Sequence, residues 1–337
     1  MTRIFYEKKM ICVSMRFMSK NDLILAGDIG GTHTRLILVD TTRKKLIEKK
    51  YASANYPNLS PIVTDFLKEA CANPLVAAFG LAGIVKDGIC KVTNLSWIVN
   101  AKEIARENSI KKVYLLNDVE ANAYGIRMLK EDEFCILNEG TEKKFGNAAL
   151  ISAGTGLGEA GLFWDGKTHI PFACEGGHSD FAPRNLEEDE LLIYLREKFG
   201  HVSYERVVSG PGIQNLYEFL VKKKKIRPID AVKDIPRALS EKRDQPGVGK
   251  EVMEWFVSLY GAESGNLALK MLAVSGIYLG GGIVPKILDV FKKKIFLEAF
   301  IDKGRYREFL TNIPVKVILN EDTALIGAVE YALLGIR

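Results

Sequence analysis

Two short glycine-rich stretches carry the residue types that bind phosphate groups. The first is Gly27-Asp28-Ile29-Gly30-Gly31-Thr32, and the second is centred on Gly154-Thr155-Gly156. Glycines let backbone amides approach a ligand closely because no Cβ is in the way, and turn amides with a threonine hydroxyl can surround phosphate oxygens. Asp28 could also meet a metal ion on those phosphates. Taken alone, each stretch is equally consistent with a tight hairpin of purely structural role.

A second set of residues could bind a ligand rich in hydroxyl groups. Asn117 and Asp118 follow an apolar stretch, Glu175 and His178 share a glycine-containing loop, and Glu205 opens another loop. Amides, carboxylates and an imidazole can all hydrogen-bond to hydroxyls, and a site built from them rejects analogues that lack one. Position alone leaves Asp118 open to two interpretations, a catalytic carboxylate at a strand end or a helix cap.

Strands are expected on both sides of each glycine-rich stretch. Residues 23–26 and 34–39 are apolar and rich in branched side chains, and residues 147–164 predict strand, turn and strand again. Because Gly27 to Thr32 is too glycine-rich for a helix or a flat strand, we expect it to form the turn. Two like hairpins in one chain indicate a duplicated fold that holds one phosphate chain between two lobes.

The rest of the chain changes character along its length. Strands alternate with helices up to about residue 129, which predicts a largely parallel sheet covered by helices. Helices dominate the middle, over residues 187–199, 212–221, 230–239 and 248–274. The last of these contains Gly261, Ala262 and Gly265, and such small residues predict close packing against another helix.

Composition limits the classes of protein that the chain could belong to. The 337 residues are enough for two domains, and 47% hydrophobic with 26% charged residues is typical of a soluble globular protein. The net charge of +5 comes from scattered lysines, and the runs 222–225 and 292–294 are short and lack interleaved aromatic residues. We therefore expect solvated helix faces and no nucleic-acid partner. No apolar run reaches the roughly 18 residues of a membrane span, so no membrane partner is expected.

Cysteines and the N-terminal segment bear on location. Five cysteines are scattered without a C-x-x-C pair, which favours reduced thiols in a cytoplasmic protein. Residues 1–20 lack the apolar core of a signal peptide and are expected to be an N-terminal extension, disordered or at a sheet edge.

The motifs together resemble a known family. Paired glycine hairpins are similar to those of the sugar kinase, heat-shock-protein-70 and actin superfamily, in which two hairpins hold the ATP phosphates. The order of motifs also resembles bacterial-type glucokinase over nearly the whole chain. EGGHSDFAP and ERVVSGPG are specific to that family, and the other matching pieces are GDIGGTHTRL, TNLSW, LLNDVEANAYGI, ISAGTGLGEAGL, LGGGIVPKI and DKGRYREFLTNIPV.

The resemblance implies a fold and a division into domains. The fold would be α/β, a two-lobed actin-like or ribonuclease-H-like ATPase fold with an interdomain cleft. Residues 21–128 with 319–337 would form a smaller α/β domain, and residues 129–318 a larger α+β domain.

The same resemblance implies an activity, ATP-dependent phosphorylation of D-glucose to glucose 6-phosphate, with Asp118 as general base on the 6-hydroxyl. Residues for the sugar would be Asn94, Asn117, Asp118, Glu175, His178 and Glu205. Residues for the nucleotide would be Gly27, Asp28, Ile29, Gly30, Gly31, Thr32, Gly154, Thr155, Gly156, Gly280 and Gly281.

Cofactor and assembly are implied as well. Asp28 would face Mg²⁺, and the protein would form a homodimer. A related repressor and kinase family binds zinc through a cysteine-rich loop, but Cys174 and His178 lack such partners here, so no zinc is expected.

Alternatives stay open at this point. The same polar residues could serve mannose, fructose or an N-acetylhexosamine, and polyphosphate could replace ATP as donor. A non-catalytic sugar-sensing regulator would need a DNA-binding domain, and about twenty residues ahead of the first strand cannot hold a helix-turn-helix with its supporting helix. Asp118 and the two hairpins also favour catalysis over sensing.

Overall fold

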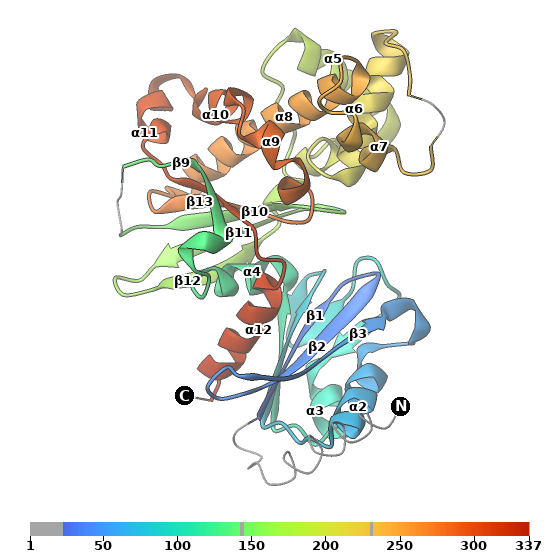
Figure 1. Cartoon of the computed structure of the whole chain (residues 1–337), viewed down its shortest axis with the longest axis vertical. Helices are drawn as coiled ribbons and strands as arrows, with labels where there is room; N and C mark the ends of the chain where they lie inside the picture. Colours follow the sequence, from blue (N-terminus) through green and yellow to red (C-terminus); the bar gives the residue numbers. More distant parts are fainter. Residues whose placement is uncertain (1–22, 142–144, 230–231, 337) are drawn as a thin grey trace. The chain divides into compact units, whose positions relative to one another are not determined.

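The computed structural model describes residues 23–141, 145–229 and 232–336. These residues divide into two compact units, which we describe separately (Figure 1). The first unit holds the described residues up to Leu129 and those from Asp322 onward, and the second runs from Lys130 to Glu321. The expected N-terminal extension, residues 1–20, lies outside the described residues.

The first unit is built on a five-stranded sheet with the order β3-β2-β1-β4-β8. Its strands are β1 (Leu23–Ile29), β2 (His33–Asp40), β3 (Lys45–Ala52), β4 (Val76–Leu81) and β8 (Lys112–Asn117). β1, β4 and β8 run parallel, whereas β1, β2 and β3 form an antiparallel meander. The prediction of a largely parallel sheet is therefore only half right, because the short connections between β1, β2 and β3 can join antiparallel strands alone.

Helices cover both faces of this sheet (Figure 1). α2 (Leu59–Ala70) and α3 (Ala101–Glu107) pack on one face, and α4 (Asp118–Ile126) and α12 (Thr323–Leu334) pack on the other. α4 and α12 approach so closely that a Cβ at Gly327 would overlap the carbonyl oxygen of Ala121. The short strands β5 (Val85–Lys86), β6 (Ile89–Lys91) and β7 (Ile98–Asn100) form a small separate sheet, and η2 (Ser53–Asn55) is a single 3₁₀ turn.

The second unit repeats the same plan. Its six-stranded sheet has the order β12-β11-β10-β13-β14-β9. Its strands are β9 (Phe134–Asn138), β10 (Ala148–Ala153), β11 (Leu157–Trp164), β12 (His169–Cys174), β13 (Gly276–Gly280) and β14 (Val315–Ile318). β10, β13 and β14 are parallel, and β10, β11 and β12 form an antiparallel meander, as in the first sheet. This correspondence confirms the predicted duplication, and β9 is an added antiparallel edge strand.

The helices of the second unit share one large apolar core with one face of the sheet. They are α5 (Leu186–Phe199), α6 (Gly210–Lys223), α7 (Ile235–Glu241), α8 (Val248–Met271), α9 (Leu288–Phe291), α10 (Lys294–Ile301) and α11 (Arg307–Thr311), with 3₁₀ turns η3 (Glu131–Glu133), η4 (Gly176–His178), η5 (Tyr204–Arg206), η6 (Val284–Ile287) and η7 (Gly304–Tyr306). A Cβ at Gly261 or Gly265 would overlap backbone oxygens of α10. The predicted close packing of the long helix is thus confirmed.

Two expectations from the sequence are corrected. Gly27, Asp28 and Ile29 belong to β1 and not to the turn, because their pairing with β2 continues to Ile29. Gly27 lies there because a side chain would clash with Leu36 and Phe79, each 2.7 Å from the added Cβ. The expectation of reduced thiols holds for Cys90, Cys135 and Cys174 but is wrong for Cys71, which is disulfide-bonded.

Candidate active site

In the first unit, the residues predicted to act in chemistry gather at one edge of the sheet. Ile29, Leu81 and Asn117 are in register across the three parallel strands. Each is the last residue of its strand, so the glycine turn after β1 and Asp118 after β8 begin at the same edge. In α/β sheets ligands bind at this carboxyl edge.

The first glycine turn is short and closed. The amide of Gly30 donates to the carbonyl of His33 over 2.9 Å, and the carbonyl of Gly30 accepts from Ser53 Oγ at 2.9 Å. A Cβ at Gly31 would lie 2.9 Å from Cβ of Asn94, so Asn94 packs directly against the turn. Thr32 is exposed beside it. The turn therefore presents the Thr32 side chain to solvent, while Gly30 and Gly31 are half-buried.

Asn117, and not Asp118, is the residue at the N-cap of α4. Oδ1 of Asn117 accepts from the amides of Val119 at 2.9 Å and Glu120 at 3.3 Å, and its Nδ2 donates to the carbonyl of Gly83 at 3.3 Å. Asp118 is the first helical residue and is partly exposed. Its Oδ1 also accepts from the amide of Val119 at 3.0 Å.

Asp28 is the second-last residue of β1, within a charged group of the first unit. Burial raises the pKa of its carboxyl group, Arg35 opposes that rise, and Asp322 adds to it. Arg35 itself contacts Asp322 at 2.6 Å and Glu48 at 2.7 Å. A cation near Asp28 would favour its ionised form, and Mg²⁺ on phosphates is commonly held by one or two carboxylates. Asp28 therefore fits the predicted metal role by its chemistry.

The second glycine turn is tied to the start of a helix. The amide of Gly154 donates to the carbonyl of Gly156 at 2.9 Å, and the carbonyl of Gly154 accepts from the amide of Gly210 at 2.8 Å. Gly210 is the first residue of α6, so the turn lies at the positive end of a 14-residue helix. Anionic groups are stabilised at such a place.

The two loops predicted to bind sugar lie side by side in the second unit. The amide of Tyr204 donates to the carbonyl of Ser179 at 3.0 Å, and the amide of Phe181 donates to the carbonyl of Val202 at 2.9 Å. Glu175 and His178 are exposed on the first loop, with Oε2 and Nε2 3.9 Å apart. Glu205 on the second loop reaches the glycine turn, where its Oε2 accepts from the amide of Leu157 at 3.1 Å. Glu175, His178, Glu205 and the Gly154–Gly156 turn thus form one neighbourhood.

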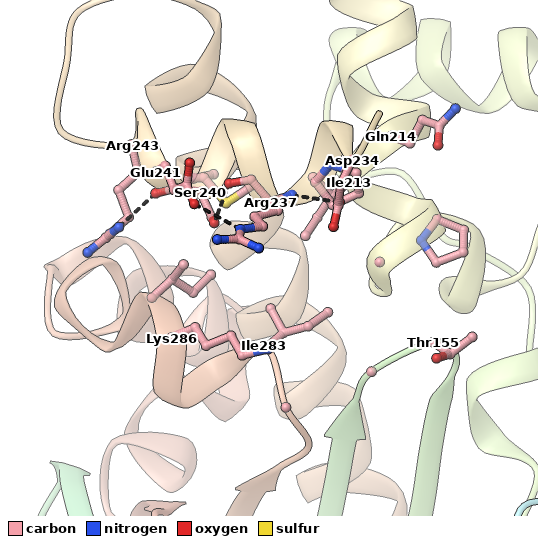
Figure 2. A pocket seen from close by; sticks show the side chains of 17 residues that line it. Thr155, Ile213, Gln214, Asp234, Arg237, Ser240, Glu241, Arg243, Ile283 and Lys286 are labelled. Carbon is pink, nitrogen blue, oxygen red and sulfur yellow. Dashed lines mark hydrogen bonds and ion pairs between the residues drawn. The ribbon is translucent and has the colours of Figure 1, made fainter. Parts of the chain in front are cut away.

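A pocket of about 990 Å³ opens beside the second glycine turn (Figure 2). Figure 2 shows Thr155 below it, side chains of α7 along one side, and Ile283 and Lys286 opposite them. Polar groups from three helical segments line it: Gln214 on α6, Asp234, Arg237, Ser240, Glu241 and Arg243 on or beside α7, and Lys286 on η6. Its volume suits a nucleotide, and a small number of polar side chains in such a pocket can fix the orientation of the ligand.

The residues of α7 escaped the sequence interpretation. α7 begins after its cap Asp234, whose side chain accepts from the amide of Arg237 at 3.1 Å. No glycine motif marks this segment, so only the tertiary structure brings it to the pocket. Gly280 and Gly281, predicted beside the adenosine, do not line the pocket, whereas Gly282 does. Gly281 has φ of +85°, and a Cβ there would overlap the carbonyl of Ala153, so it serves the close approach of this loop to β10.

Two further features of the described residues bear on metal binding and on membranes. Within the described residues, no group of three or more His, Cys, Asp or Glu side chains could hold a metal ion by itself. Among the helices of the described ranges, none combines the length and apolar character that crossing a bilayer requires.

Comparison with solved structures defines the class of protein. A glucokinase from an Antarctic psychrotroph superposes with a TM-score of 0.80 and 28% identity, over 92% of this chain and 98% of that chain. A glucokinase from Streptomyces griseus of the ROK family, solved with glucose and AMPPNP, shares the fold at a TM-score of 0.65 and 20% identity, over 93% and 100%. Fold and site together define a sugar kinase with the two-lobed actin-like ATPase fold.

Sequence comparison gives the family. The glucokinase family model matches residues 25–334. Glucokinase from Nostoc punctiforme is 40% identical over 334 residues, covering 91% of this chain and 97% of its own, and glucokinase from Tolumonas auensis is 35% identical, covering 91% and 96%. The chain belongs to the glucokinase family, and it is an enzyme of that family.

Proposed function

We propose that the protein transfers the γ-phosphoryl group of ATP to the 6-hydroxyl of D-glucose, with Asp118 as general base. Glucose and ATP as substrates agree with the family to which the chain belongs. The observation that carries the assignment of the site is the position of Glu205 between the second glycine turn and the loop of Glu175 and His178. Its side chain accepts from the amide of Leu157, directly after the turn at Gly154–Gly156. It also follows Tyr204, whose amide is hydrogen-bonded to the loop of Glu175 and His178.

Different residues bind the sugar, accept the proton and bind the nucleotide. Asn94, Asn117, Glu175, His178 and Glu205 hold the sugar hydroxyls, and Asp118 accepts the proton of the 6-hydroxyl as it attacks. Backbone amides of the turns at Gly30–Thr32 and Gly154–Gly156 hold the phosphates, and the α7 pocket holds the nucleoside. Phosphoryl transfer involves little covalent chemistry by the protein, so positioning and charge stabilisation supply most of the catalysis.

Asp28 is the residue that we propose to hold Mg²⁺. Its carboxyl lies on β1 directly before the first turn, and burial raises its pKa in the absence of a cation. When bound, the ion would neutralise charge on the β- and γ-phosphates. We propose no zinc.

Three further properties stand as proposals, the first two from the family resemblance and the third from the scattered cysteines. The two compact units would correspond to the smaller and larger domains, divided near residues 128 and 319. The protein would form a homodimer. It would act in the cytoplasm, a proposal that the disulfide-bonded state of Cys71 does not support.

A panel assay tests the proposal. Purified protein with Mg²⁺ and ATP is offered glucose, mannose, fructose and N-acetylglucosamine, and the sugar phosphate is identified; polyphosphate replaces ATP in a parallel series. We expect glucose 6-phosphate with the highest kcat/KM, and ATP as donor. A higher kcat/KM for another hexose would assign the site to that sugar, and tight glucose binding without turnover would identify a sugar sensor.

A further inference from the structure

Two buried carboxyl groups lie beneath the loop of Glu175 and His178, and the site described above does not use them. Glu159 on β11 is 1% exposed and Glu263 on α8 is 0% exposed. The charge of Glu263 raises the pKa of Glu159, so the two carboxyl groups are close neighbours. Two neighbouring buried carboxylates repel each other when both are ionised, so burial favours a proton on one of the two groups.

Glu159 supports the turn η4 from below. A Cβ added to Gly176 would overlap Oε2 of Glu159, so this carboxyl oxygen lies directly against the backbone of the turn. Gly177 is held equally closely against the carbonyl of Leu157 on the same strand. β11 is therefore the floor of the turn that carries His178, and the Glu159 side chain is part of that floor.

Glu263 connects the same pair to the second loop. Nδ2 of Asn266 donates to Oε2 of Glu263 at 2.8 Å and to the hydroxyl of Tyr204 at 3.0 Å. Tyr204 precedes Glu205, and its amide is bonded to Ser179 at 3.0 Å. The pair thus contacts η4 directly and η5 through Asn266, so one buried network lies under both candidate sugar loops.

We propose that Glu159 and Glu263 share one proton and act as positioning residues that hold η4 and η5 in the arrangement that glucose requires. This inference rests on the sugar-binding role proposed for the two loops. Oε1 of Glu159 is buried and has no hydrogen-bond partner among the described residues. An ionised Glu159 would therefore add a charge that its surroundings leave uncompensated, which is costly.

The surroundings of the pair fix the direction of its response to pH. Burial first, and then the charge of Glu263, raises the pKa of Glu159 to about 8. Lys270 opposes the rise, with its Nζ 3.1 Å from Oε1 of Glu263. The other titratable groups that face the pair are Cys174 on β12, Tyr260 on α8, Tyr204 in η5 and Lys303. When pH passes the pKa of Glu159, two negative charges meet under η4 and repel each other.

The glucose KM as a function of pH tests this proposal. If only the protonated pair holds the loops, about one tenth of the protein is competent one pH unit above the pKa of Glu159, so the glucose KM should rise about tenfold from pH 7 to pH 9. The ATP KM should change by less than about twofold. Glu159→Gln keeps a donor toward Glu263 but cannot ionise, so its glucose KM should stay flat over the same range. Glu254→Gln, on the same helix α8 and ion-paired with Lys293 at 3.2 Å, is the matched control and should follow the parent.

An infrared measurement decides the question even if Glu159→Gln does not fold. The parent should show the carbonyl band of a protonated buried carboxyl group at neutral pH, and the band should vanish as the pH rises through about 8. A missing band, or a glucose KM in Glu159→Gln that rises in parallel with the parent, would overturn the proposal. So would a glucose KM that depends on potassium, because a cation would then separate the two carboxylates. An unchanged glucose KM in His178→Ala would instead reject the sugar role of the loop and leave the infrared result untouched.

Discussion

Asp118 is the residue on which the proposed chemistry depends most. Asn117 supplies the N-cap of α4, so Asp118→Asn should leave the helix start intact. The amide cannot accept the proton of the 6-hydroxyl, and loss of a general base typically lowers the rate by about 10²–10⁴-fold. We expect kcat to fall by this amount while glucose still binds, because the amide oxygen can accept from the hydroxyl. A coupled assay and calorimetry on one preparation measure both quantities.

The matched control is Asp65→Asn, an exposed carboxylate on α2 of the same unit, which should leave kcat unchanged. A kcat for Asp118→Asn within about threefold of the parent, against the decades expected, would contradict the general-base assignment. Loss of glucose binding together with kcat would assign Asp118 to sugar binding alone.

Side chains differ in how far a sequence can place them. Glycine motifs and the loop of Glu175 and His178 could be predicted to matter because glycine and clustered polar residues have few structural reasons to occur together. The place of Arg237 and Lys286 in the pocket could not be predicted, because a cation on a helix is most often a solvated residue. Glu159 was missed for another reason, since nothing in its sequence neighbourhood signals that Glu263, from a helix far along the chain, lies against it.

Two separate structural elements should control the two substrates. The turn η4 carries His178, and η6 with α7 forms the pocket that contains Lys286. Losing a hydrogen bond to a charged group costs about 1.5–3 kcal/mol, or roughly one to two decades of affinity. We expect His178→Ala to raise the glucose KM by this amount and the ATP KM by less than about threefold. Lys286→Ala should instead raise the ATP KM and leave the glucose KM nearly unchanged. The rise should be near the lower limit of this range, because the Lys286 side chain is exposed.

Each of these variants has a control in which another residue of the same type is replaced. His169 on β12 bonds the carbonyl of Gly146 at 2.9 Å, away from the loop, and Lys292 is exposed but does not line the pocket. His169→Ala and Lys292→Ala should leave both KM values at the parent level. If His178→Ala or Lys286→Ala raised both KM values equally, the turn or pocket wall would have a structural role only.

Elements were predictable where one local signal dominated. Both hairpins, the long helix α8 and the strand before Asp118 follow from apolar runs and small residues. β9 and β12 could not be predicted, because as edge strands they mix exposed and buried residues and depend on β14 and β11 for pairing. Strand direction was also beyond the local pattern, which is why a largely parallel sheet was expected and mixed sheets were found.

At the scale of the whole molecule, each unit has its own copy of the sheet and its own candidate residues. Asp118 follows β8 in the first unit, and the candidate sugar loops and the pocket beside α7 belong to the second. The second copy of the sheet differs from the first by the buried pair of Glu159 and Glu263. Glu159 lies on β11, the strand that follows the second glycine turn. A buried ionisable group links the stability of the molecule to pH, so this difference should be visible in unfolding as well as in kinetics.

The pH dependence of stability should therefore change when Glu159 is replaced. Its pKa is about 8 in the folded protein, above the ordinary value of 4.5, so between these values the folded state holds a proton that the unfolded state has lost. Stability from this group is full below 4.5, falls as the pH rises, and is gone above about 8. Urea unfolding across this range should show the parent losing stability relative to Glu159→Gln as the pH increases, whereas Glu254→Gln should track the parent. Parallel curves for the parent and Glu159→Gln would show that Glu159 is already ionised in the folded protein at neutral pH.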